Sequence, residues 1–120
     1  MQFSVNYNQK DDYIVGNFIG DLNKNSVKEY AQAIIDSSKE NNCTRLLNDL
    51  REANIGISII EFYNFQKTII TEDVDQSWKR AIVAKENIKE LDFYETVSYN
   101  QGYHLRIFND IDKAIEWLNT

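Results

Sequence analysis

The sequence has no proline, one histidine and one cysteine, and each shortage excludes a class of protein. Without proline there is no proline-rich linker, and no low-complexity segment or internal repeat divides the 120 residues. The single cysteine, Cys43, cannot form an intrachain disulfide, so a reducing compartment is expected. Together with His104 it is also too little for a structural zinc site. We therefore expect neither a metal nor a cofactor.

Long apolar runs and concentrated basic charge are also missing. No apolar run approaches the roughly 18 residues that a membrane span requires, and residues 1–12 lack the basic and apolar blocks of a signal peptide. The formal net charge is −6, and the 13 basic residues are scattered among 19 acidic ones. A nucleic-acid-binding protein gathers its basic residues on one face. We therefore expect a cytoplasmic protein with no nucleic-acid partner and no membrane insertion.

The length and composition are those of one ordinary folded domain. The 120 residues are 42% hydrophobic and 27% charged, which is typical of globular proteins. A chain of this length buries roughly two-thirds of the surface that its unfolded form exposes, so one core supports it. We expect residues 1–120 to form a single domain.

The spacing of apolar residues predicts strands that alternate with helices. Residues 3–7 and 13–20 are predicted to form two strands joined by a short loop, which favours antiparallel pairing, and Gly16 suggests a bulge in the second. Three later strands are predicted at 44–50, 79–85 and 104–108. Helical periodicity lies between and after these strands. The order β-β-α-β-α-β-α-β-α predicts an α/β domain with a mixed, mainly parallel sheet covered by helices.

Each predicted helix begins near a side chain that can accept hydrogen bonds from free backbone N–H groups of the first turn. Three starts fit the capping box, in which a polar side chain three residues later bonds back to the cap. These pairs are Ser26 with Glu29, Ser58 with Glu61, and Asn87 with Glu90. Asn109 or Asp110 is expected to cap the last helix, and Gly102 to end the helix before it.

The end of the sequence carries a family resemblance. In "LRIFNDIDKAIEWLN" a strand that ends in Phe leads through D-x-x-x-A-x-x-W-L into the last helix; the residues concerned are Phe108, Asp110, Ala114, Trp117 and Leu118. This ending and the order of elements resemble the STAS domains of anti-sigma-factor antagonists and the related SpoIIAA-like proteins. The resemblance implies a SpoIIAA-like fold and a non-catalytic regulatory role, with a protein partner bound around the second helix.

The same resemblance draws attention to Ser58. In these antagonists a serine of an Asp-Ser-Ser-Gly motif begins the second helix and is phosphorylated by a partner kinase, and the spacing from residues 48–50 brings Ser58 to that position. Here Ile57, Ile59 and Ile60 stand where the motif has Asp, Ser and Gly. The phospho-acceptor motif is therefore not intact. A helix cap explains Ser58 without phosphorylation.

Two other groups of polar side chains have structural explanations. Cys43 and His104 are predicted at the amino-terminal edge of the sheet, whereas sites in α/β sheets form at the opposite edge, so no nucleophilic pair is expected. The loop with Glu72, Asp73 and Asp75 lacks the ligand spacing of an EF-hand, so we expect a solvated acidic loop. No catalytic residue is predicted.

The second predicted helix, residues 58–70, has more apolar side chains than one buried face can hold. A stripe that includes Ile59 and Phe62 satisfies packing against the sheet. The apolar side chains left to be covered are those of Ile57, Ile60 and Phe65. Burying such a residue stabilises a protein by roughly 1.5–3 kcal/mol, so we expect a cover: the neighbouring helix, another protein chain or an apolar ligand. Phe93 and Tyr99 give the third helix a similar surplus.

Two functions follow, and the sequence leaves both open. The first is a non-catalytic interaction module that binds a regulatory protein or a second copy of itself. The residues expected to contribute are Arg51, Glu52, Asn54, Ile57, Ser58, Ile60 and Phe65. The second is a carrier of a small apolar ligand or lipid, because the SpoIIAA-like fold is similar to that of SEC14-type lipid carriers, which have a pocket under their helices. An enzyme is not expected.

Overall fold

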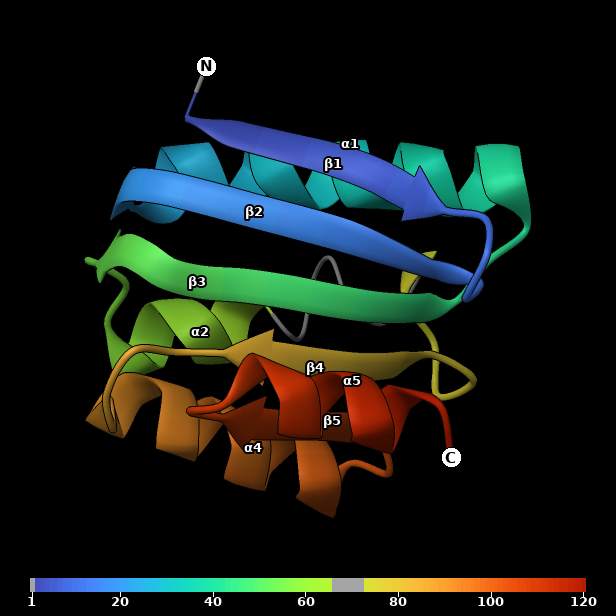
Figure 1. The fold of residues 1–120 in the computed structure, drawn as a ribbon. Coiled ribbons are helices and arrows are strands. Elements are labelled where there is room, and N and C mark those ends of the chain that lie inside the picture. The colour runs from blue at the N-terminus through green and yellow to red at the C-terminus, as the bar shows by residue number, and fades with distance from the viewer. Residues whose placement is uncertain (1, 66–72) are drawn as a thin grey trace.

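Five strands form one sheet, and their order along the chain is also their order in the sheet (Figure 1). The computed structural model describes residues 2–65 and 73–120, without the side chain of Phe65. The strands are β1 (Phe3–Asn8), β2 (Tyr13–Leu22), β3 (Arg45–Ile55), β4 (Lys79–Val83) and β5 (His104–Phe108). β1 is antiparallel to β2, and the remaining neighbours are parallel. The predicted mixed, mainly parallel sheet is confirmed.

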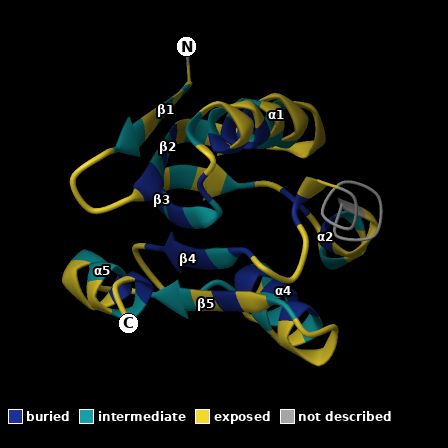
Figure 2. Cartoon of the chain, turned by 90° about the vertical axis from the view of Figure 1, so that its right-hand side faces the viewer, coloured by how far each residue is buried: buried dark blue, intermediate teal, exposed yellow. Residues whose placement is uncertain are grey.

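Helices cover the sheet on both faces (Figure 2). The helices of the described residues are α1 (Lys24–Asn41), α2 (Ile59–Phe65), α4 (Lys89–Asn100) and α5 (Ile111–Leu118), which confirms the predicted order of elements. α1, α2 and α4 cover one face, and α5 covers the β3–β5 part of the other. The sheet therefore has two cores, a large one under α1, α2 and α4 and a small one under α5.

α1 begins three residues earlier than the sequence predicts. Asn23 is its cap and accepts hydrogen bonds from the backbone N–H groups of Asn25 and Ser26, both at 3.0 Å. Ser26 is the third residue of the helix and closes the box by accepting from the Asn23 N–H at 2.9 Å. The predicted Ser26–Glu29 box is therefore wrong. Asparagine caps a helix as well as serine does, so the earlier cap takes the position.

α4 begins without a side-chain cap, so the predicted Asn87–Glu90 box is also wrong. Ile88 occupies the cap position and packs against the large core. The packing of this apolar side chain, and not a capping hydrogen bond, positions the chain where it enters the helix. At the other end Gly102 has φ +82°, a left-handed conformation that favours glycine, and the Tyr103 N–H bonds to the Ser98 carbonyl at 2.9 Å. The predicted glycine stop is confirmed.

β3 continues to Ile55, five residues beyond its predicted end. Its last residues pair with the end of β2, after a register shift between Asn17 and Ile19. The pairs Asn17↔Asp49 and Ile19↔Glu52 leave the extra residue in β3, so the prediction of a bulge at Gly16 of β2 is wrong. Arg51, Glu52 and Asn54 belong to this strand and not to a loop.

α5 is capped by Asp110, the second of the two predicted candidates. Its carboxylate accepts from the Asp112 N–H at 2.9 Å, while the Asn109 side chain donates to the Ala84 carbonyl at 3.1 Å. Across residues 2–65 and 73–120, no helix is both long enough and apolar enough to span a membrane.

Candidate functional site

The start of α2 is closed by the predicted capping box, which is confirmed. The Glu61 N–H donates to Ser58 Oγ at 3.2 Å, and the Ser58 N–H donates to the Glu61 carboxylate at 3.1 Å. Hydrogen bonding from the backbone and the side chain of Ser58 to the Glu61 carboxylate lowers the pKa of Glu61, because it stabilises the ionised form. The Ser58 hydroxyl thus has a structural role at the helix start.

The apolar residues around this helix start divide into buried and exposed ones. Ile57 is 3% exposed and belongs to the large core, so the prediction that it is surplus is wrong. Ile60 is 72% exposed and Tyr63, one helical turn later, is 46% exposed, so the two share one side of α2. Phe62 faces inward and stacks on Tyr94 at 5.0 Å between ring centroids. The Phe65 side chain and residues 66–70 lie outside the described residues.

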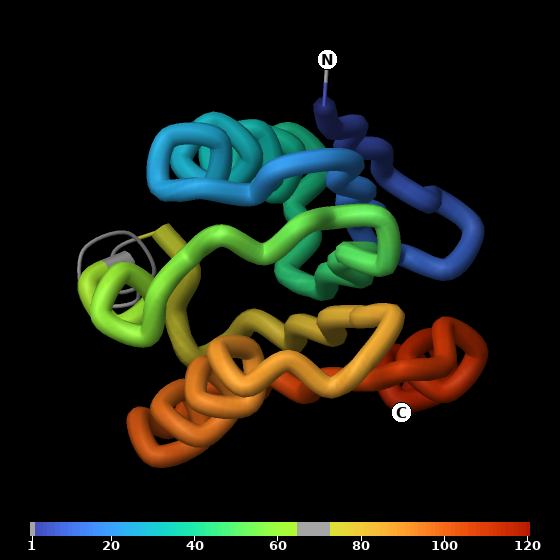
Figure 3. Tube along the Cα trace, turned by 90° about the vertical axis from the view of Figure 1, so that its left-hand side faces the viewer, coloured from blue at the N-terminus to red at the C-terminus, as the bar shows by residue number. Residues whose placement is uncertain are grey.

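Glu52 and Asn54, two of the polar residues predicted for partner binding, lie on the other face of the sheet. Ala53 and Ile55 pack against the large core, so the alternating Glu52 and Asn54 point to the opposite face. Asn54 donates to the Asp21 carboxylate at 3.2 Å. Ser58 and Ile60 belong to the α2 side. The residues therefore share the carboxyl edge of the sheet, which Figure 3 views from the front, but they lie on different sides of it.

Arg51 is held in place by Asp49. The guanidinium binds the carboxylate with two hydrogen bonds, Nε to Oδ1 at 2.9 Å and Nη2 to Oδ2 at 2.8 Å. This paired, charge-assisted contact keeps the pKa of Asp49 below its usual value. Arg51 nevertheless keeps substantial exposure, so an oriented guanidinium, paired with Asp49, stands at this edge of the sheet.

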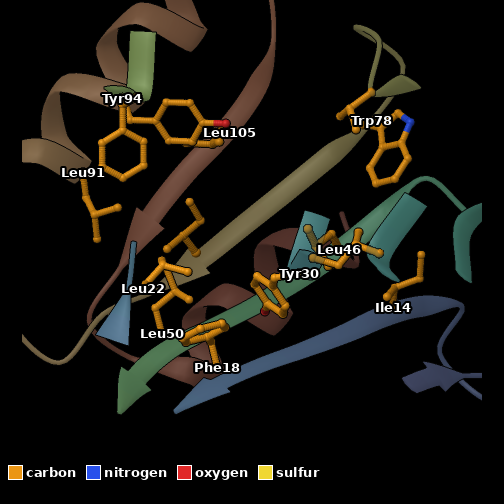
Figure 4. Close-up of a cluster of buried hydrophobic side chains, with 14 of the residues drawn as sticks. Ile14, Phe18, Leu22, Tyr30, Leu46, Leu50, Trp78, Leu91, Tyr94 and Leu105 are labelled. Carbon is orange, nitrogen blue, oxygen red and sulfur yellow. The ribbon is translucent and has the colours of Figure 1, made fainter. Parts of the chain in front are cut away.

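A cavity of about 70 Å³ lies between the sheet and helices α1, α2 and α4 (Figure 4). Its lining is mostly leucine, isoleucine, valine and aromatic side chains, and Leu91 and Tyr94 reach it from α4. Tyr30 and Asn48 also line it and bond to each other at 2.6 Å. Burial raises the pKa of the Tyr30 hydroxyl, so it stays protonated and donates to Asn48. Arg80 also lines the cavity.

No protein-family model and no curated protein matches the sequence. Solved structures do match the fold. An uncharacterised protein from Shewanella loihica, described as having a SpoIIAA-like fold, is 17% identical with a TM-score of 0.64, and the match covers 97% of this chain and 91% of that one. The chain has the SpoIIAA-like fold.

Two anti-sigma factor antagonists with the same architecture support this. One, from Mycobacterium paratuberculosis, is 13% identical with a TM-score of 0.60, and 98% of this chain and 95% of that chain are covered. The other, SpoIIAA in its unphosphorylated form, is 9% identical with a TM-score of 0.54, with 97% and 96% covered. At these identities the likeness concerns the fold, and it confirms the architecture predicted from the ending of the sequence.

The SpoIIAA-like fold keeps Cys43 and His104 apart, although both lie at the amino-terminal edge as predicted. His104 pairs with Lys79 of β4, which pairs with Arg45 of β3, so a whole strand separates the two. Two strand spacings are roughly 10 Å, beyond hydrogen-bond reach. Cys43 is buried, which raises the pKa of its thiol, and His104 is exposed.

The acidic loop does not gather ligands within the described part of the chain. Asp75 accepts hydrogen bonds from the backbone and side chain of Ser77, and Asp73 pairs with Lys39 at 3.7 Å. Glu72 lies outside the described residues. Among residues 2–65 and 73–120 there is no group of three or more histidine, cysteine or acidic side chains able to hold a metal.

The residue that sequence reasoning missed is Arg80. It is 5% exposed, lies in β4 on the same face as Ile82, and lines the cavity. From the sequence, Lys79 and Arg80 are simply isolated basic residues beside an apolar run. The signal was the alternation within the strand, because Arg80 shares its face with Ile82 and Ala84 in the large core.

Proposed function

We propose that this protein is a non-catalytic interaction module that binds a regulatory protein through the start of α2. The observation that carries the proposal is the exposure of Ile60 beside Tyr63 on one side of a short helix. Two structures with this fold are anti-sigma factor antagonists, which by name act on another protein. The proposal includes a cytoplasmic location and residues 1–120 acting as one unit.

The exposed side of α2 suits an apolar anchor in a protein interface. Covering a side chain such as Ile60 contributes roughly 1.5–3 kcal/mol, and a few buried anchors dominate most interfaces. Ile57 is buried in the large core just before α2, so in this proposal it supports the helix start and does not contact the partner. Phe65, the last residue of α2, is also proposed to contact the partner.

Polar residues at the carboxyl edge extend the proposed surface. Glu52 and Asn54 are exposed at the end of β3, and Arg51 is oriented by Asp49 before any partner arrives. A charge that is already fixed loses little side-chain entropy on binding. We propose that the partner covers α2 and reaches around this edge. Ser58 contributes to the proposed surface by capping α2, and this contribution does not require phosphorylation.

The test compares two surface variants of the tagged protein in its source cells. Ile60→Glu should lower the recovery of one specific protein at least tenfold, because it places a charge in the contact. Tyr99→Glu is the matched control, since Tyr99 is strongly exposed at the far end of α4, toward the amino edge of the sheet. Both variants should unfold within about 0.5 kcal/mol of the wild type, as surface changes usually do.

Two results would count against the proposal. Undiminished recovery with Ile60→Glu would remove α2 as the binding surface. If the co-purifying chain is a second copy of this protein, the surface serves self-association instead of a regulatory partner.

A second candidate function is the binding of a small apolar ligand, and the cavity under α1, α2 and α4 favours it. The lining is mainly apolar, as in most small-molecule sites. Native mass spectrometry of protein isolated from its source should then show a fixed added mass. A bare polypeptide, together with no thermal stabilisation by small apolar probes, would exclude this function. The test does not depend on the partner of α2.

A further inference from the structure

We propose that the cavity binds a small carboxylate with an apolar body, and that Arg80 is the counter-charge that receives it. This inference rests on the second candidate function, in which the cavity takes a ligand, and is independent of the partner at α2. It adds the chemical class of the ligand: one negative charge on a short apolar chain.

The buried guanidinium of Arg80 is only partly satisfied. Its Nη1 donates to the Tyr94 hydroxyl at 2.9 Å, whereas its Nη2 has no hydrogen-bond partner in the described part of the protein. Arginine stays charged at any physiological pH, so it cannot escape burial by losing its proton. Buried polar groups are nearly always hydrogen-bonded, and an unpaired donor of a buried charge is a strong exception.

No carboxylate of the described residues neutralises this charge. The ion pairs found there are Lys39 with Asp73 and Arg51 with Asp49. Arg80 lies instead beside two aromatic rings, 5.8 Å from the centroid of Tyr94 and 5.9 Å from that of Tyr103. These cation–π contacts stabilise the charge but accept no N–H hydrogen bond in the plane of the guanidinium. A position for an external anion is therefore left beside Nη2.

Tyr94 adds a second donor at the same place. Its oxygen accepts from Arg80, and among the described residues no acceptor faces its own hydrogen. An anion beside Nη2 could accept from both groups, in the way that carboxylates bind paired donors. Tyr94 is itself fixed by its stacking on Phe62 of α2. One cation and one hydroxyl match a monoanion better than a phosphate dianion, which carries more charge and more acceptors.

The remainder of the lining determines the body of the ligand. Leu22, Leu50, Leu91 and Leu105 surround the space in Figure 4, so an uncharged, apolar chain fits it. The volume of about 70 Å³ is small. An engineered cavity that binds benzene measures about 150 Å³, so the ligand that fits here is smaller, with a body of roughly three or four carbons. Butanoate is the probe of this size.

The experiment measures binding of butanoate and butanamide to the full chain by calorimetry at constant ionic strength. The two probes have the same shape and differ in charge. We expect the carboxylate to bind at least tenfold more tightly to the wild type, and Arg80→Met to abolish that preference. Arg106→Met is the matched control, because Arg106 is exposed, does not line the cavity and lies against Phe108 and Trp117 of the small core, so it should leave the preference unchanged.

Each outcome separates the inference from the function on which it rests. If neither probe binds the wild type, the cavity does not take ligands of this size. The carboxylate inference and the second candidate function are then both wrong. If both bind equally, the cavity binds ligands but Arg80 does not select an anion. If chloride stabilises the protein as much as butanoate does, Nη2 binds a simple ion only, and this result also overturns the carboxylate assignment. Should Arg80→Met fail to fold, Tyr94→Phe replaces it, with a several-fold loss for butanoate and no change for butanamide.

Discussion

Gly16 is the position where one added methyl group should have the clearest effect. It lies in β2 where the Tyr30 ring crosses the strand to reach Asn48 of β3. A Cβ built at Gly16 would overlap Tyr30 Oη and lie 3.0 Å from Cζ and 3.3 Å from Cε1. The ring cannot simply retreat, because Phe3 and Phe18 pack against it with centroids 5.4 and 5.3 Å away.

The magnitude follows from three contributions. Overpacking a tight core costs about 1–3 kcal/mol, and displacing Tyr30 from Asn48 removes a hydrogen bond worth about 1 kcal/mol. Alanine restricts the unfolded chain more than glycine does, which offsets about 0.4–1 kcal/mol. We therefore expect Gly16→Ala to lower the free energy of unfolding by about 1–3.5 kcal/mol. For 120 residues this is a fall in melting temperature of about 4–14 °C.

Urea denaturation of a double-mutant cycle checks the cause as well as the size. Tyr30→Phe removes the overlapping oxygen, so the combined variant should be at least 1 kcal/mol more stable than the sum of the single losses predicts. Gly56→Ala is the matched control, because its Cβ would meet only the Leu22 carbonyl at 3.5 Å, an ordinary contact. It should be neutral or slightly stabilising. Strict additivity, or a Gly16→Ala variant as stable as the wild type, would refute this packing.

Three further substitutions test other contacts by denaturation. Ser98 is fully buried and its hydroxyl has no partner within the described residues, so Ser98→Ala should leave stability unchanged or raise it by about 1 kcal/mol; a clear loss would contradict this. Ser58→Ala should cost about 1 kcal/mol and Ser58→Asp much less, since aspartate also caps; equal losses would mean that the cap is unimportant. Arg51 lowers the folded-state pKa of Asp49 below 3.8. The loss in free energy of unfolding caused by Asp49→Asn should therefore be constant above about pH 5 and shrink as the pH falls below 4. A loss that stays the same down to pH 2 would exclude this ion pair.

Much of this architecture could be predicted because most elements have one buried face. Alternating and helical spacing depends only on which side of an element meets the core, and that is written locally in the sequence. β3 was predicted too short because Arg51, Glu52 and Asn54 look like loop residues. They belong to the end of a strand where Glu52 and Asn54 are exposed while Ala53 and Ile55 pack inward. Only pairing with the end of β2 reveals this, and pairing is not local.

The candidate site was predictable only in part, for a similar reason. Ile57 and Ile60 are equivalent in composition, but α2 begins at Ile59, so helical spacing does not apply to Ile57, which turns into the core. Arg80 shows the same limit. Its strand position was evident, yet the lack of a counter-charge depends on what α4 and β5 place around it, including Tyr94 and Tyr103.

The most direct test of the central proposal is site-specific photocrosslinking in the source cells. A photoreactive amino acid replaces Ile60 in one sample and Tyr99 in another, both exposed positions. The proposal predicts one discrete covalent adduct with a different protein at position 60 and none at position 99. No adduct at position 60, or the same adducts at both positions, would contradict the assignment of α2 as the partner-binding surface.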